Sequence, residues 1–332
     1  MNREHVLVVY SGWLGDFVWL VPALHALKQG FPWVSVVVSE LQQPLAECLC
    51  GSTLDQVFVD RKRDRRACAR EVRAKSRELG IDTFLDVRGR LKAGLYIPHT
   101  SGAELYIPAR RDAREFWPAK LLHPLARTAP ERPAGQHMVE SYLGFAQALR
   151  IPETRLRFDM DFSEATVARA ERLIADAGLR DRRTVALNLG SALFSKIWPA
   201  ERFRRLAEAI ESDLDCKAVI MGARRFKIND DYDLKASRAH FGDGRFLNLV
   251  EETDLLTDSY LLSSGVFDVA AGNDSFPGHM AGSAGEVEPG AEGSRTAEDG
   301  RAWRANYTVS LFGPSNPQFC RPYDPTGRFN MV

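Results

Sequence analysis

The sequence opens with VLVVY (6–10), SGWLGD (11–16) and FVWLVPALHALKQ (17–29). A valine-rich apolar run ends in a short loop that contains two glycines, and an apolar helical pattern follows at once. This order predicts a strand, a tight turn and a helix, with Asp16 at the carboxyl end of the strand. Ligands of open α/β sheets bind at that edge. Asp16 is therefore the first candidate for chemistry.

Composition narrows the class of protein. The chain has 332 residues, 45% hydrophobic and 27% charged, which is typical of a globular protein with two domains. Basic and acidic residues balance overall, and basic stretches are not interleaved with aromatic residues, which argues against nucleic-acid binding. The five cysteines have no zinc-binding spacing and favour reduced thiols in the cytoplasm. No apolar run is long enough to span a bilayer. The N-terminal apolar stretch also lacks the basic leader and the cleavage site of a signal peptide.

Apolar runs alternate with helical patterns through the whole chain, which predicts an α/β fold with two doubly wound parallel sheets. The expected strands of the first half are 5–10, 34–39, 55–59, 83–87 and 103–107. Its expected helices are 18–29, 43–49, 66–79 and 137–149. The second half is expected to have strands at 184–190, 217–223, 266–272 and 308–313, with helices at 164–177, 200–213 and 254–263.

We expect a first domain over residues 1–155 and a second over 156–332, because Pro152 breaks a helical pattern near the join. Two segments depart from the regular alternation. The segment 61–78 is densely basic, and its ordinary interpretation is a solvated helix face. The segment 285–301 is rich in Gly, Glu and Ala without an apolar period, which is typical of a mobile surface insert.

The first loop leaves the role of Asp16 open. Asp is a favoured N-cap, and the helix dipole stabilises its charge. Pro22, however, would fall inside a helix that began at Asp16, so the regular helix is also compatible with a start near Leu20. In that case Asp16 would belong to the loop and face the ligand crevice. The glycine spacing is not that of a dinucleotide-binding loop.

Three later segments also end strands with polar residues. In NLGSALFSKIWP (188–199), Ser191 offers a hydroxyl and Lys196 a charge suited to a phosphate, although both residues are also ordinary in a solvated loop. In GNDSFPGH (272–279) a helix begins near Pro277, and its free amides suit a diphosphate. Taken alone, this segment favours plain capping by Asp274 or Ser275 and a structural role for His279. LFGPSNP (311–317) is a turn at another carboxyl edge.

Taken in order, these segments resemble the heptosyltransferases of glycosyltransferase family 9, which transfer heptose from ADP-heptose to the inner core of lipopolysaccharide. The family has G-D before an apolar helix with a proline, a strand end followed by K-x-W-P, an N-D-S-G-P-M-H segment and L-F-G-P-T-x-P. The matching stretches here are SGWLGD, NLGSALFSKIWP, NDSFPGH and LFGPSNP. In addition, HMVESYLGFAQALRI (137–151) resembles the family helix that precedes the domain join.

The resemblance implies two facing Rossmann-like domains of the GT-B type, with an active-site cleft between them and no metal or other cofactor. It implies that Asp16 is the general base for an inverting transfer. The donor-binding residues that it implies in the second domain are Ser191, Lys196, Asp274, Ser275, Gly278 and His279. The resemblance further implies that an anionic acceptor binds to Gly15 and to three basic residues after the fourth expected strand. These basic residues are Arg88, Arg90 and Lys92.

The chain also departs from the family pattern. Phe276 replaces the glycine that follows N-D-S, and MGARRFKIND (221–230) lacks a clear match for the acid that reaches the nucleotide ribose. The insert 285–301 interrupts a short connection, and the family usually continues after LFGPSNP into a helix that crosses back to the first domain.

We therefore expect a cytoplasmic heptosyltransferase whose partners are ADP-heptose and an anionic glycolipid, in peripheral contact with the inner membrane. The alternatives are a related transferase with another nucleotide sugar or acceptor, and a sugar-nucleotide-binding protein without turnover. A nucleotide-sugar epimerase is less compatible, because it would need further acids in the second domain.

Overall fold

The computed structural model describes residues 4–61, 64–88, 104–107, 127–128, 136–152, 156–222, 232–250, 252–283, 307–323 and 330–331. The expected insert 285–301 lies outside the described residues, as do Arg90 and Lys92. The chain divides into two units, Met1–Asp161 and Phe162–Val332. The join expected after residue 155 falls just before this division.

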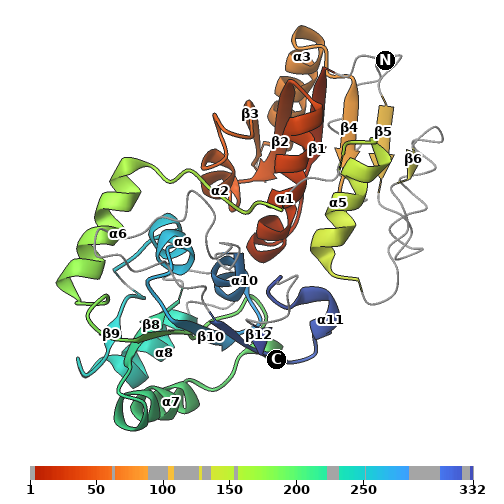
Figure 1. The fold of residues 1–332 in the computed structure, drawn as a ribbon. Coiled ribbons are helices and arrows are strands. Elements are labelled where there is room, and N and C mark those ends of the chain that lie inside the picture. Colours follow the sequence, from red (N-terminus) through yellow and green to blue (C-terminus); the bar gives the residue numbers. More distant parts are fainter. Residues whose placement is uncertain are drawn as a thin grey trace. The chain divides into compact units, whose positions relative to one another are not determined.

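The first unit contains a six-stranded parallel sheet among its described residues, in the order β3-β2-β1-β4-β5-β6 (Figure 1). Its strands are β1 (His5–Val9), β2 (Trp33–Ser39), β3 (Gln56–Asp60), β4 (Thr83–Asp86), β5 (Glu104–Ile107) and β6 (Arg127–Thr128). Its helices are α1 (Leu14–Gly30), α2 (Gln43–Glu47), α3 (Arg65–Glu78) and α5 (Met138–Ala148). The central strands β1 and β4 are buried along their whole length, which explains their continuous apolar runs.

The second unit repeats this arrangement. Its described residues form a second parallel sheet in the order β12-β11-β10-β7-β8-β9. The strands are β7 (Thr184–Asn188), β8 (Lys217–Met221), β9 (Leu247–Asn248), β10 (Val269–Asn273), β11 (Tyr307–Leu311) and β12 (Asn330–Met331). The helical segments are α6 (Glu164–Asp176), η2 (Phe194–Lys196), α7 (Ala200–Asp213), α8 (Tyr232–Phe241), α9 (Leu255–Ser263), α10 (Phe276–Ser283) and α11 (Pro317–Cys320). In chain order both sheets have the Rossmann strand order 3-2-1-4-5-6.

Each sheet has its own apolar core. In the first unit, Leu7, Val9 and Phe84 of the central strands pack with residues of α3, among them Val72. In the second unit, the core residues come chiefly from β7, β8 and α7: Val185, Leu187, Phe203, Ala207, Ile210, Ala218 and Ile220. The expected α/β class with two parallel sheets is confirmed.

Helix α1 corrects both interpretations of the first loop. The helix begins at Leu14, and its N-cap is Trp13, whose side chain makes no capping bond. Asp16 is therefore neither the cap nor a loop residue but lies in the first turn, and Pro22 lies inside the helix. An internal proline costs about 3 kcal/mol. Burial of nearly every apolar side chain of α1, which packs beside α5 (Figure 1), outweighs that cost.

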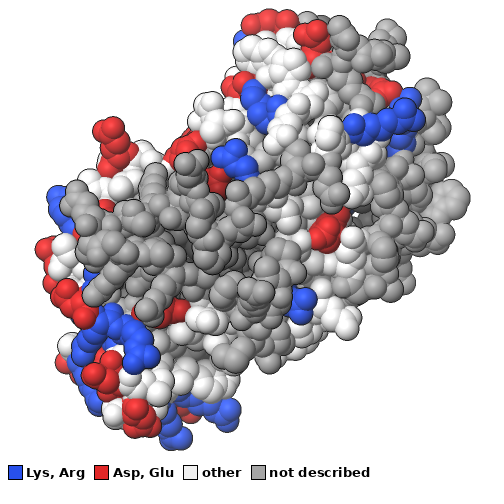
Figure 2. All heavy atoms as spheres, in the orientation of Figure 1, with Lys and Arg blue, Asp and Glu red and all other residues white. Residues whose placement is uncertain are grey.

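Helix α3 accounts for most of the basic segment. Asp64 caps it by accepting a hydrogen bond from the Ala67 amide, and Cys68, Ala69 and Val72 face the core. The same helix also carries exposed arginines: Arg66, Arg70 and Arg73. On the face drawn in Figure 2, basic and acidic side chains of the described residues alternate across the surface. No helix in the described part of the chain is both long and apolar enough to cross a bilayer.

Candidate active site

One candidate site lies in the first unit where β1 and β4 meet, at the topological switch point of the first sheet. Asp16 stands in the first turn of α1, after β1, and Arg88 follows β4. Arg88 Nη1 donates to Asp16 Oδ2 over 2.6 Å. The two side chains keep similar contact with solvent, 19% for Arg88 and 18% for Asp16. The sheet thus brings together two residues that are 72 positions apart in the sequence.

Arg88 is held by a wider set of contacts. Its Nη1 also donates to the Tyr142 hydroxyl over 3.2 Å, and its amide donates to Asp86 Oδ1 over 3.2 Å. Burial by itself lowers the pKa of Arg88, but interactions with Tyr142, Asp16 and Tyr10 outweigh it and hold the pKa above its ordinary value. Arg88 is thus a fixed positive charge beside the Asp16 carboxylate. The sequence predicted that Arg88 binds the acceptor, and in the structure its guanidinium contacts Asp16, the candidate base.

The loop before α1 has a fixed backbone. The Tyr10 hydroxyl donates to the Trp13 carbonyl over 2.7 Å, and Gln42 Nε2 donates to the Gly12 carbonyl over 2.7 Å. A Cβ at Gly12 would lie 2.2 Å from the Tyr10 hydroxyl, so a side chain at this position would displace the tyrosine. Gly15 is buried in the first turn of α1. These contacts hold the start of α1, and with it Asp16, in one place.

A second candidate site lies in the second unit at the equivalent switch point of its sheet, where β7 and β10 meet. Lys196, at the end of η2, donates from Nζ to Asp274 Oδ2 over 2.6 Å. His279 of α10 brings Nε2 to 3.8 Å from Asp274 Oδ1. The Lys196 side chain is 20% exposed, whereas that of Asp274 is only 2% exposed. Asp274 therefore lies beneath Lys196 and holds it at the edge of the sheet, whereas the His279 side chain is 5% exposed and nearly as buried as Asp274.

Hydrogen bonds join the loop after β7 to the loop after β10. Asn273 Oδ1 accepts from the Trp198 amide over 2.8 Å, and its Nδ2 donates to the Leu189 carbonyl over 2.7 Å. Asn188 Nδ2 donates to Ser275 Oγ over 2.9 Å. Sequence reasoning missed this role of Asn188 and Asn273. An amide residue at the end of an otherwise apolar buried strand is the signal that could have found them.

Two further predicted residues belong to the same junction. Ser191 Oγ donates to the Asp274 carbonyl over 3.4 Å. Gly278 lies in the first turn of α10, where a Cβ would lie 3.3 Å from Ser310 Oγ. A Cβ at Gly313 would lie 2.7 Å from the Ser195 carbonyl. The turn LFGP therefore supports the backbone that carries Lys196. This gives a physical role to a motif that looked like an ordinary turn in the sequence.

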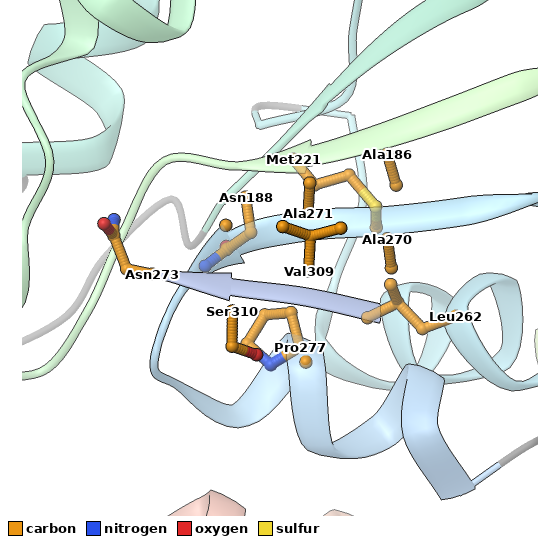
Figure 3. Close-up of a pocket in the computed structure, with 12 residues that line it drawn as sticks. Ala186, Asn188, Met221, Leu262, Ala270, Ala271, Asn273, Pro277, Val309 and Ser310 are labelled. Carbon is orange, nitrogen blue, oxygen red and sulfur yellow. The ribbon is translucent and has the colours of Figure 1, made fainter. Parts of the chain in front are cut away.

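Figure 3 shows a pocket of the second unit that lies between the sheet and the start of α10. Its walls are mainly apolar, and its polar side chains come from strand ends. The lining residues are Ala186, Asn188, Met221, Leu262, Ala270, Ala271, Gly272, Asn273, Pro277, Gly278, Val309 and Ser310. Such a lining is poorly suited to a charged group. The pocket is therefore poorly suited to a diphosphate.

No group of three His, Cys, Asp or Glu side chains that could hold a metal ion occurs among the described residues. The residues gathered at the two switch points are a carboxylate beside an arginine in one unit, and a lysine, a histidine and a helix N-terminus in the other. The first set suits proton transfer, and the second suits a phosphate group.

Comparison with solved structures supports the fold. A glycosyl transferase family 9 protein from Veillonella parvula DSM 2008 matches with a TM-score of 0.74 and 19% identity, covering 100% of this chain and 87% of that one. The Escherichia coli ADP-heptose lps heptosyltransferase II matches with a TM-score of 0.69 and 17% identity over 99% of this chain and 90% of the other. The E. coli heptosyltransferase WaaC with ADP gives 0.65 and 19%, covering 95% and 89%. At these identities the likeness shows the GT-B fold.

Comparison with curated protein sequences gives no match. The sequence profile of glycosyltransferase family 9 (heptosyltransferase), however, matches residues 65–286, which is more than half of the chain. This match spans parts of both units, including Arg88, Lys196 and the NDSFPGH segment. The chain is therefore a glycosyltransferase that belongs to family 9, the heptosyltransferases.

Proposed function

We propose that the protein transfers a heptose from ADP-heptose to an inner-core sugar of lipopolysaccharide, with inversion at the anomeric carbon. The observation that carries this proposal is the pair of switch-point sites, a solvent-accessible carboxylate in one unit and a phosphate-compatible basic edge in the other. The family match supports the reaction class, whereas the donor, the acceptor and the stereochemistry are the substance of the proposal.

In the proposed reaction, Asp16 accepts the proton of an acceptor hydroxyl as its oxygen attacks the anomeric carbon. The bond from that carbon to the diphosphate breaks, and ADP leaves with the bonding electron pair. Arg88 keeps Asp16 ionised until the hydroxyl oxygen gains positive charge. The reaction requires that a donor held by the second unit presents its anomeric carbon to Asp16.

Lys196, Ser191 and His279 would hold the departing diphosphate, together with the backbone amides around Ser275 and Gly278 at the start of α10. A helix N-terminus and a lysine stabilise the charge that develops on the leaving group without a metal ion. Asp274 would not contact the donor through its carboxylate but would hold Lys196 and His279 in place.

We further propose that Arg90 and Lys92, outside the described residues, bind anionic groups of the acceptor. Gly15 would let the acceptor approach the α1 backbone. The exposed arginines of α3 support a cytoplasmic enzyme in peripheral contact with the anionic leaflet that carries the acceptor.

The test is a transfer assay with the full chain, ADP-heptose and a deacylated inner-core acceptor. We expect release of ADP together with a heptosylated product. GDP- and UDP-activated sugars serve as controls and should give no product. Product from one of these donors instead would assign the chain to a related transferase. Phe276, the first residue of α10, stands where family members have glycine; ADP binding without product on any acceptor would make the chain a sugar-nucleotide-binding protein.

A further inference from the structure

Trp13 is an exposed aromatic residue beside the candidate base. It is 42% exposed, whereas the two aromatic residues that follow it in α1, Phe17 and Trp19, are 0% and 4% exposed. An indole left in water forfeits the gain from burying one of the largest apolar side chains. Exposure alone assigns no role, because Trp33 is 48% exposed; Trp13 differs in lying next to the first turn of α1, which carries Asp16.

The backbone around Trp13 is rigidly held, so its exposure is not fraying of a helix end. Tyr10 bonds to the Trp13 carbonyl, and Gln42, itself fully buried, bonds to the carbonyl of Gly12. The Tyr10 ring fills the space beside Gly12 that a side chain would need. These contacts fix the backbone while leaving the indole in solvent.

Trp13 and Asp16 share the same end of α1. Trp13 is the N-cap and Asp16 the third helical residue, so the two residues lie within one helical turn of each other. Leu41, 38% exposed, adjoins Gln42 beyond the end of the neighbouring strand β2. The same edge of the sheet thus presents an apolar surface next to a carboxylate and a guanidinium.

We propose that Trp13 is a binding platform for the sugar ring of the acceptor, and this inference rests on the proposed function. One face of a sugar ring exposes C–H groups, which are attracted to the electron-rich face of an indole. The hydroxyls at the edge of the ring then point toward Asp16. A sugar suits this mixed surface better than an acyl chain does, because the Asp16–Arg88 pair beside the indole is charged and partly exposed.

The test is calorimetric binding of a deacylated lipopolysaccharide core oligosaccharide to the full chain, which requires no turnover. We expect Trp13→Ala to weaken the Kd about threefold to tenfold, the range for one aromatic contact, and Trp13→Phe to weaken it less. Trp33→Ala is the matched control, because Trp33 is 48% exposed but begins β2 at the opposite edge of the sheet. Its Kd should equal that of the unaltered protein, and both alanine variants should keep the Tm of the unaltered protein.

Three results would overturn the platform: no binding of the oligosaccharide to the unaltered protein, an unchanged Kd in Trp13→Ala, or a loss seen only with an acylated acceptor, which would assign Trp13 to the lipid. Asp16→Asn separates this inference from the proposed function. If Asp16→Asn transfers sugar normally while Trp13→Ala binds the oligosaccharide poorly, the assigned base is wrong and the platform stands. If Asp16→Asn is inactive while Trp13→Ala binds normally, only the platform is wrong.

Discussion

The two units each place an ion pair of the same length at the same topological point, yet the two pairs differ in burial. The nitrogen and oxygen are 2.6 Å apart both in Arg88–Asp16 and in Lys196–Asp274. The Asp16 side chain is 18% exposed, whereas that of Asp274 is 2% exposed. A carboxylate in contact with solvent can meet a substrate hydroxyl, while a buried one acts mainly on its protein neighbours. Under the proposed function, solvent access, and not ion-pair geometry, distinguishes the proposed base Asp16 from the proposed supporting residue Asp274.

The largest effect expected from this comparison is on turnover in Asp16→Asn. Removal of a general base lowers a rate by about 10²–10⁴-fold. Single-turnover ADP release should fall by that amount, while the Tm stays close to that of the unaltered protein, because the side chain is partly exposed and asparagine has nearly the same shape. A rate close to that of the unaltered protein would show that the accessible carboxylate is not the base.

Asp274→Ala should instead act on stability. Removing one partner of a buried ion pair costs about 3–5 kcal/mol when the remaining charge stays buried. The Lys196 side chain is 20% exposed, so we expect a loss below that range but above that of an exposed pair. Urea unfolding of the full chain measures this loss. Arg169→Ala is the matched control, because Arg169 pairs with Asp254 over 2.8 Å where both side chains are well exposed. It should cost less than about 1 kcal/mol. Equal losses in both variants would contradict a supporting role for Asp274.

Arg88→Met tests the accessible pair through its pH profile. A guanidinium beside a carboxylate favours the charged form, so its loss should move the acid limb of kcat/KM to higher pH by about one unit or more. Arg88→Lys keeps the charge and should restore the position of the limb. Tyr142→Phe removes only the hydroxyl that supports Arg88 and should move the limb less. A higher KM for the acceptor with an unmoved limb would assign Arg88 to the acceptor instead.

Asp258 of α9 extends the comparison between the partly exposed Asp16 and the buried Asp274 to a third acid. Its buried Oδ1 has no hydrogen-bond partner in the described part of the chain. Burial raises the pKa of Asp258 to about 7, with Thr253 opposing the rise and Asp254 adding to it. The folded state then binds the proton more tightly than the unfolded chain does, whose pKa is about 3.9. Stability contributed by this group is present below about pH 4 and is lost as pH rises toward about 7.

Asp258→Asn cannot ionise and should remove this dependence. Thermal unfolding at several pH values measures it: the Tm of the variant should exceed that of the unaltered protein at pH 8, and the difference should shrink toward pH 4. A constant difference across this range would show that Asp258 titrates normally in the folded state.

The sequence predicts the architecture well because buried parallel strands are continuous apolar runs. The runs around β1, β4 and β7 lie within a residue or two of the strands observed. The two-residue strands β6, β9 and β12 were missed, since so short a segment has no periodicity. The predicted start of α1 at residue 18 was wrong, since the helix begins at Leu14. The unfavourable effect of Pro22 inside a helix is outweighed by burial of the whole helix, which a local pattern does not show.

The sequence names single candidate residues but not the contacts between them. Asp16 and Arg88 are far apart in the chain, and only the β1–β4 pairing brings them together. The contact between Gly313 and the Ser195 carbonyl likewise depends on β10 lying between β7 and β11. Such contacts follow from strand order, which a single sequence does not contain.

The proposal assigns the chemistry to the first unit and phosphate binding to the second. Its most direct test is the ADP affinity of two variants, measured side by side by calorimetry. Lys196→Gln keeps a donor for Asp274 but removes the charge, and we expect it to weaken the Kd for ADP about tenfold or more, with little change for adenosine. Asp16→Asn should bind ADP as the unaltered protein does. An equal loss of ADP affinity in both variants, or a loss confined to Asp16→Asn, would contradict the assignment of chemistry to the first unit and phosphate binding to the second.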